Sequence, residues 1–270
     1  MLVDGSIEPL ADARYLLSPG DLYALRQIPE IVAAGIAALK IEGRYKDADY
    51  VALTTRAYRQ AVDEAWAGRP LSITPREELE LEQVYSRGLG PFFLTGTNHQ
   101  AVVEGRAPRH RGVEIGSVTR VEFDRVTISP GPANDIAPLK PGDGVVFDAA
   151  AWRSPEEHEE GGRVFTAHSH LNGEIELQFA NGAICFDRIH AGDLLWRTHD
   201  PEIDRLARPF LEAATPLARQ RVNIAVEARE GEPLRSIWSL EKAAAHQCTN
   251  RFPRAPGSCP KPGPNSRNAA

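Results

Sequence analysis

The chain has 270 residues, of which 42% are hydrophobic and 25% charged, with a net charge of -6. These values are typical of a soluble globular protein with one or two domains. Its apolar stretches are far shorter than the ~20 residues of a membrane span. Three cysteines without a CxxC pair argue against a disulfide scaffold and a zinc finger. We therefore expect a cytoplasmic protein, whose negative charge disfavours bulk electrostatic binding of nucleic acid but still allows a local basic groove.

Residues 1–70 predict alternating strands and helices. The apolar run at 15–17 predicts a buried strand, after which Asp21 could cap a short helix. A second strand is predicted at 37–41. Asp47 is suited to be the N-cap of a long amphipathic helix that follows. This order favours a parallel sheet, and because two parallel strands cannot cover both of their faces, we expect further strands to precede Met1.

The rest of the chain predicts a change to β structure. Residues 71–107 form a connector with one acidic helix near 77–82. Residues 108–212 alternate in polarity between Gly-Asp and Asn-Gly turns, which predicts a small antiparallel β-barrel. Alternation resumes at 213–240, the expected start of a further β module. Residues 241–270 contain five prolines and no alternating pattern, so we expect a disordered or aberrant tail.

Two short motifs stand out in the first 70 residues, YLLSPGDL at 15–22 and LKIEGR at 39–44. Together they resemble peptidase family U32, the collagenase-like peptidases, and the second motif is fairly specific in this context. The likeness covers residues 3 to about 238. Weaker glycine motifs fit the downstream pattern of the family: Ser86-Arg87-Gly88, Arg111-Gly112 and Gly116.

The resemblance implies a fold of two parts. Residues 1–70 would be the last βα units of a truncated, TIM-barrel-like catalytic domain, and small antiparallel β domains would follow. The fold class is then α/β plus all-β. The resemblance also implies a partner, either a missing N-terminal barrel segment or a separate subunit that supplies it.

The resemblance implies enzymes of several kinds. Some relatives are proteases, and others act in C5 hydroxylation of pyrimidines in tRNA or rRNA or in ubiquinone hydroxylation. Several hold an iron–sulfur cluster through cysteines. Ligands for a cluster are not evident here, because the upstream cysteine signature is absent and Tyr23 stands where many relatives have cysteine.

Three readings of function remain open. The first is that the intact protein acts in pyrimidine hydroxylation with tRNA or rRNA as partner and without a membrane. The second is a protease, and the third is a non-catalytic binding module or a decaying gene product. We expect the chain alone to be inactive.

Lys40, Glu42 and Arg44 are the candidate catalytic residues. They lie at the C-terminal end of the predicted strand at 37–41, the end at which barrel enzymes build their active sites. A carboxylate there could act as a base or hold an amine, and Arg44 could clamp a phosphate or carboxylate. The alternative is an ion-pair network that closes the barrel end.

A basic cluster precedes the predicted β-barrel. It consists of Arg106, Arg109, His110 and Arg111, and it could contact an RNA backbone. A solvated linker is the favoured interpretation, because the chain is acidic overall.

Overall fold

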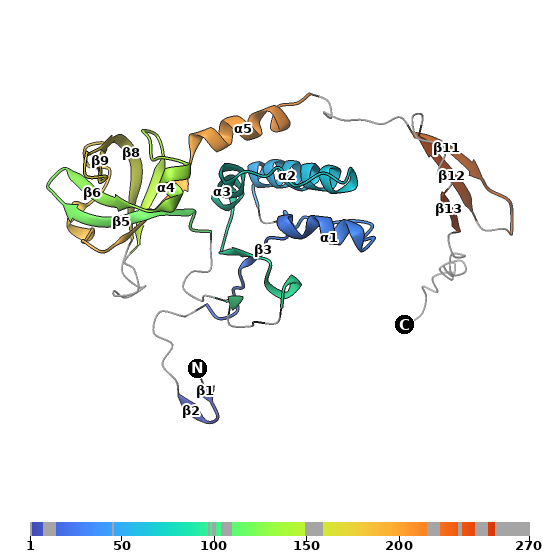
Figure 1. The fold of residues 1–270 in the computed structure, drawn as a ribbon, viewed down its shortest axis with the longest axis horizontal. Coiled ribbons are helices and arrows are strands. Elements are labelled where there is room, and N and C mark those ends of the chain that lie inside the picture. Colours follow the sequence, from blue (N-terminus) through green and yellow to red (C-terminus); the bar gives the residue numbers. More distant parts are fainter. Residues whose placement is uncertain are drawn as a thin grey trace, which may run out of the picture. The chain divides into compact units, whose positions relative to one another are not determined.

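A computed structural model describes residues 2–7, 15–44, 46–96, 98, 101–103, 110–148, 159–214, 222–231, 234–240 and 248–251. The chain divides into two compact units, residues 1–212 and 213–270. The first unit holds a group of helices and a β-barrel, and the second holds a small sheet (Figure 1).

The helices of the first unit pack around α2. Helix α2 contacts α1, α3 and α5. Leu25, Ile28 and Leu53 are almost completely inaccessible to solvent in the core of this group. The helical elements are η1 (Leu25–Gln27), α1 (Ile28–Ala33), α2 (Ala48–Trp66), α3 (Pro75–Val84), η2 (Phe92–Leu94) and α5 (Pro201–Leu211).

Local sequence signals account for the helix ends. The Asp47 side chain accepts a hydrogen bond from the Tyr50 N–H at 2.9 Å, so the predicted N-cap of α2 is confirmed. Thr74 and Glu77 form a reciprocal capping box at the start of α3. Gly35, which follows α1, has a φ of 73°, the left-handed conformation typical of the residue after a helix.

The two strands predicted in the first 70 residues are wrong. Residues 15–17 form a turn, and 37–41 form an irregular segment. The parallel pair that does occur joins β3 (Asp21–Leu22) to β4 (Leu89–Gly90). A parallel strand needs hydrogen-bonded neighbours, and the described residues supply none to 37–41. A TIM-barrel-like arrangement is therefore not confirmed.

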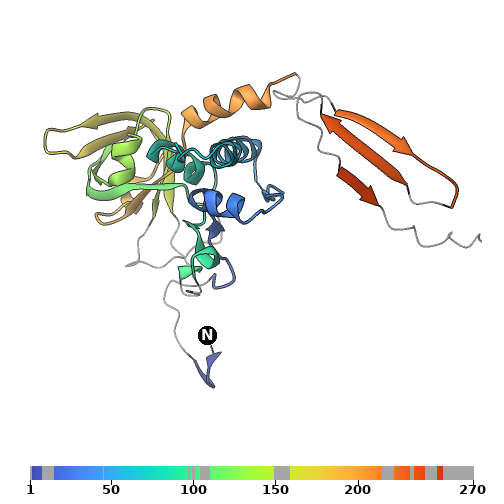
Figure 2. The same cartoon turned by 45° about the vertical axis from the view of Figure 1, so that its right-hand side comes forward.

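The predicted antiparallel β-barrel is confirmed. Six antiparallel strands close in the order β10-β5-β6-β9-β8-β7. Figure 2 shows the barrel in a second view. Ile115, Ile128 and Leu177 are completely buried in its core. The barrel strands are β5 (Val113–Val121), β6 (Arg125–Pro130), β7 (Gly144–Asp148), β8 (Glu160–Ser169), β9 (Ile175–Phe179) and β10 (Leu194–His199), with α4 (Pro132–Ile136) and η4 (Phe186–Arg188) in the connections.

A buried arginine joins the barrel to the helices. Arg197 on β10 is 1% exposed. Its Nε donates to Gln83 Oε1 at 2.8 Å, and Gln83 Nε2 donates to the Arg197 carbonyl oxygen at 2.8 Å. Its Nη1 donates to the carbonyl oxygen of Ala137 at 3.0 Å. The two bonds with Gln83 attach α3 to the barrel wall.

The remaining elements are short. A two-stranded hairpin lies near the N-terminus, β1 (Leu2–Val3) with β2 (Ser6–Ile7). The second unit is an antiparallel sheet of β11 (Val222–Glu227), β12 (Arg235–Leu240) and β13 (Cys248–Arg251). Strand β13 lies in the segment for which we expected no regular structure. Apart from β13, residues 241–270 lie outside the described part of the chain. No helix in the described ranges combines the length and apolarity that crossing a membrane requires.

Candidate functional site

An open cleft of about 500 Å³ lies beside α2. Its walls come from β3, the irregular segment 39–44, the N-terminal part of α2 and the residues that follow α3. Sequence segments far apart in the chain therefore meet at one place.

All three predicted site residues line this cleft. Lys40 Nζ lies 3.1 Å from Glu42 Oε2, and their side chains are 84% and 70% exposed. Arg44 lies on the same segment and also lines the cleft. The segment is irregular and is not the end of a strand, so their position at the cleft does not depend on the predicted β structure. Their catalytic role stays a prediction.

Asp21 is the most strongly held carboxylate of the cleft. Arg87 donates to it from the backbone N–H (2.9 Å), from Nε (3.2 Å) and from Nη2 (2.9 Å), and Lys46 Nζ lies 3.5 Å away. Burial alone would raise the pKa of Asp21, but the hydrogen bonds from Arg87 and the charge of Lys46 outweigh it and lower that pKa. Asp21 is therefore not the predicted helix cap. Ala24 holds that position before η1.

Two tyrosine rings lie close to the Lys46 ammonium group. The Lys46 side chain is only 11% exposed, and its ammonium group lies over the Tyr85 ring and 5.5 Å from the centre of the Tyr50 ring. Cation–π attraction stabilises such a position. The Tyr85 ring also stacks on His110, with centroids 5.3 Å apart and an interplanar angle of 17°.

His110 is therefore a packed residue. Its Nδ1 accepts a hydrogen bond from the Ser86 N–H at 2.8 Å, and burial lowers its pKa. Arg111 pairs with Asp148 at 3.2 Å and with Glu159 at 2.6 Å. The other two members of the predicted basic cluster, Arg106 and Arg109, lie outside the described residues. The two described members are thus held by internal contacts, which does not support an open RNA-binding surface there.

The cleft differs in charge from the chain as a whole. Its described lining has four basic residues and two acidic ones, whereas the chain has a net charge of -6. The three tyrosines Tyr50, Tyr58 and Tyr85 line it as well. A positive cleft with aromatic walls is suited to an anionic ligand that carries planar groups.

Comparison with known sequences shows that the cleft lies within a stretch that matches a protein-family model. Residues 4–104 match the model of the family described as peptidase family U32. We call this matching stretch the U32 segment. Every lining residue of the cleft lies inside the U32 segment, from Asp21 to Arg87, whereas the β-barrel begins after it.

Three curated relatives match parts of this chain. An uncharacterized protease of Methanocaldococcus jannaschii is 39% identical over 131 residues, 47% of this chain and 32% of the relative. A tRNA hydroxylation protein of Bacillus subtilis is 37% identical over 87 residues, 32% of this chain and 21% of the relative. The 23S rRNA 5-hydroxycytidine synthase of Escherichia coli is 28% identical over 139 residues, 49% of this chain and 20% of the relative. The matches thus span a third or less of these curated relatives.

The described residues do not fit an iron–sulfur cluster. A cluster is held by about four cysteine or histidine ligands. Cys185 is the one cysteine whose side chain the structure describes, and it is exposed on the barrel. The described ranges also contain no group of three or more histidine, cysteine, aspartate or glutamate side chains placed to hold a metal.

The sequence-based prediction named three of the fourteen described residues that line the cleft. Asp21 and Arg87 are 66 residues apart, and Lys46 reaches Asp21 from the residue before the N-cap of α2. The one sequence signal was that the motifs at 15–22 and at 86–88 occur together in the family resemblance. That co-occurrence could have suggested that the two segments meet.

Proposed function

We propose that this chain is part of a U32 protein that acts in C5 hydroxylation of pyrimidines in tRNA or rRNA, and that its cleft contacts the RNA. The observation that carries the proposal is the local excess of positive charge in a chain of net charge -6. RNA binding depends largely on basic groups that meet phosphates. Relatives named for tRNA and rRNA hydroxylation support this substrate class.

In this proposal each group in the cleft has a separate task. Lys40 and Arg44, whose segment is exposed, bind phosphate oxygens of the entering strand. Glu42 is the carboxylate that accepts a hydrogen bond or a proton from the substrate. Arg87 and Lys46 are engaged with Asp21, so they shape the floor of the cleft.

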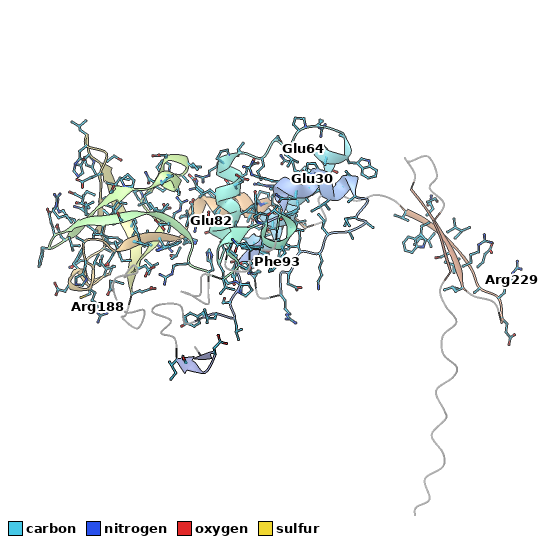
Figure 3. The ribbon with its side chains drawn as sticks, turned by 60° about the horizontal axis from the view of Figure 1, so that its bottom comes forward. Glu30, Glu64, Glu82, Phe93, Arg188 and Arg229 are labelled. Carbon is cyan, nitrogen blue, oxygen red and sulfur yellow. The ribbon has the colours of Figure 1, made fainter. Side chains whose placement is uncertain are left out.

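Exposed apolar side chains near the cleft support a partner structure. Leu22 and Leu39, which line the cleft, are 59% and 42% exposed. Elsewhere in the U32 segment, Ile36 is 58% exposed and Phe93, labelled in Figure 3, is 57% exposed. The two-residue strands β3 and β4 form a parallel pair without further described neighbours. Parallel sheets are normally covered on both faces. We therefore propose that a barrel segment or a separate subunit covers this surface.

The test is RNA binding by the full chain. Lys40→Ala and Arg44→Ala should each weaken binding of a single-stranded oligoribonucleotide about three- to tenfold. Each should also reduce the slope of the logarithm of the binding constant against the logarithm of the salt concentration by roughly one. Fluorescence anisotropy at two or more salt concentrations measures both. Arg208→Ala is the matched control, because its side chain is 61% exposed on α5 and does not line the cleft. Equal affinity in all variants would refute the role of the cleft.

A protease is the second candidate. The Methanocaldococcus jannaschii relative carries that name. Against it, the described lining of the cleft contains no serine, cysteine or histidine that could supply the usual nucleophile and base. Unaltered RNA in a deletion strain, together with lost cleavage of a protein substrate, would favour the protease.

A further inference from the structure

A second concave surface lies at one end of the barrel, outside the U32 segment. It is an open groove of about 810 Å³, between the tip of the β5–β6 hairpin, β8 and the turn after β9. Its lining includes four phenylalanines, Phe123, Phe165, Phe179 and Phe186. Phe179 and Phe186 pack edge to face with their centroids 6.5 Å apart, so the groove has a rigid aromatic floor.

Two of these phenylalanines are turned toward solvent. Phe123 occupies the tip of the β5–β6 hairpin and is 97% exposed, although polar residues usually occupy such tips. Phe165 on β8 is 66% exposed. The register of β8 against β9 shifts between Val164 and Thr166, so Phe165 is the extra residue of a β-bulge. Bulges redirect a side chain and are often found next to functional sites.

The charge of the groove indicates what it would bind. Glu122, Asp124 and Asp187 line it, and no lysine or arginine is among its described lining residues. Two of these acids are already paired with arginines beside the groove: Arg125 pairs with Asp124 at 2.8 Å, and Arg120 pairs with Glu122 at 3.0 Å. Arg188, labelled in Figure 3, pairs with Glu160 at 3.3 Å. No described residue forms an ion pair with Asp187. Asp187 is therefore the acid that gives the groove its negative charge, and it would repel a phosphate group and attract a cationic side chain.

We propose that this groove binds a segment of a partner protein in which arginine alternates with apolar residues. The apolar side chains pack between Phe123 and Phe165, and the guanidinium groups meet Asp187 and the aromatic faces. The groove shares no residue with the cleft of the U32 segment, so the proposal does not depend on the function proposed above.

The test uses the full chain and three fluorescent probes. The first is a pentapeptide that alternates leucine and arginine, the second replaces arginine by glutamate, and the third is hexauridylate. We expect the arginine peptide to bind, and Phe123→Ser and Phe165→Ser to weaken it about tenfold. Leu171→Ser is the matched control, because Leu171 is fully exposed at another hairpin tip of the same barrel and does not line the groove. Asp187→Asn should weaken the arginine peptide and leave the glutamate peptide unchanged.

Each other outcome overturns the proposal. Absence of arginine-peptide binding, or equal binding of the two peptides, would exclude recognition by charge. Equal weakening by Leu171→Ser would place the interaction away from the groove. Binding of hexauridylate through the same phenylalanines, without the peptide, would make the groove an RNA site.

Discussion

His110 shows how one side chain can support a cleft without entering it. Its ring stacks on Tyr85, and the Lys46 ammonium group lies over that same tyrosine. Its Nδ1 accepts the Ser86 N–H, so the ring proton of the neutral imidazole lies on Nε2. A second positive charge in this stack would have to be buried near Lys46. Burial is the main reason that the pKa of His110 is lowered, and the charge of Lys46 acts in the same direction; together they outweigh the backbone hydrogen bonds and the charge of Asp47, which would raise that pKa.

The lowered pKa of His110 predicts a loss of stability in mild acid. The unfolded chain, in which a histidine has a pKa of about 6.5, binds the proton before the folded chain does. The stabilisation is therefore complete above that pH, and it falls as the pH decreases toward 5. His110→Phe keeps an aromatic ring but cannot titrate. Urea denaturation between pH 7.5 and 5 should show a smaller decrease in the unfolding free energy for this variant. An identical decrease in both proteins would contradict the prediction.

At the scale of single elements, the start of β5 depends on a close approach of two backbones. Gly112 has a φ of +86°, and a Cβ atom there would collide with the carbonyl oxygen of Arg197 on the neighbouring strand β10. Gly173, in the turn between β8 and β9, has the same φ of +86° but nothing within 4 Å of a Cβ position. These glycines share one backbone conformation and differ in available space.

Alanine substitutions at Gly173 and Gly112 distinguish the cost of backbone strain alone from the cost of strain together with steric collision. Gly173→Ala should cost about 1–2 kcal/mol, the price of placing alanine in the left-handed region. Gly112→Ala should cost about 1–3 kcal/mol more, because the backbone of β10 must also move. Thermal and urea denaturation of both variants measure the difference. Equal losses of unfolding free energy in the two variants would mean that β5 and β10 can move apart at Gly112 without a further loss of stability.

At the scale of the whole first unit, one buried charge cluster holds the helices on the barrel. The guanidinium of Arg197 lies 3.8 Å from both Asp143 and Asp200, and these carboxylates are 0% and 2% exposed. Lys140 Nζ donates to Asp200 Oδ1 at 2.7 Å, and Arg76 on α3 lies 3.6 Å from Asp200. Removing Arg197 leaves Asp143 and Asp200 with less positive charge beside them, and it leaves Gln83 Oε1 and the Ala137 carbonyl oxygen without their donor.

Arg197→Met should therefore destabilise the chain by about 3–5 kcal/mol. Arg208→Met is the control, because it removes an exposed arginine and should change stability by less than about 0.5 kcal/mol. Chemical denaturation followed by tryptophan fluorescence measures both. A neutral effect of Arg197→Met would mean that apolar packing alone joins α3 to the barrel.

The sequence by itself determined the features that depend on neighbouring residues. The N-cap at Asp47, the amphipathic helix that follows it and the alternating strands of the barrel were all predicted correctly, because capping and periodicity are local properties. Lys40, Glu42 and Arg44 could be selected for the same reason, since they share one short motif.

Only the tertiary structure decided which distant residues lie beside the motif that contains Lys40, Glu42 and Arg44. The strand predicted at 37–41 does not form, because a parallel strand is held by hydrogen bonds to partners that no local pattern reports. Asp21 meets Arg87 across 66 residues, and Gln83 meets Arg197 across 114. These pairs exist because the chain packs its helices against the barrel, and long-range packing determines which distant charges become neighbours.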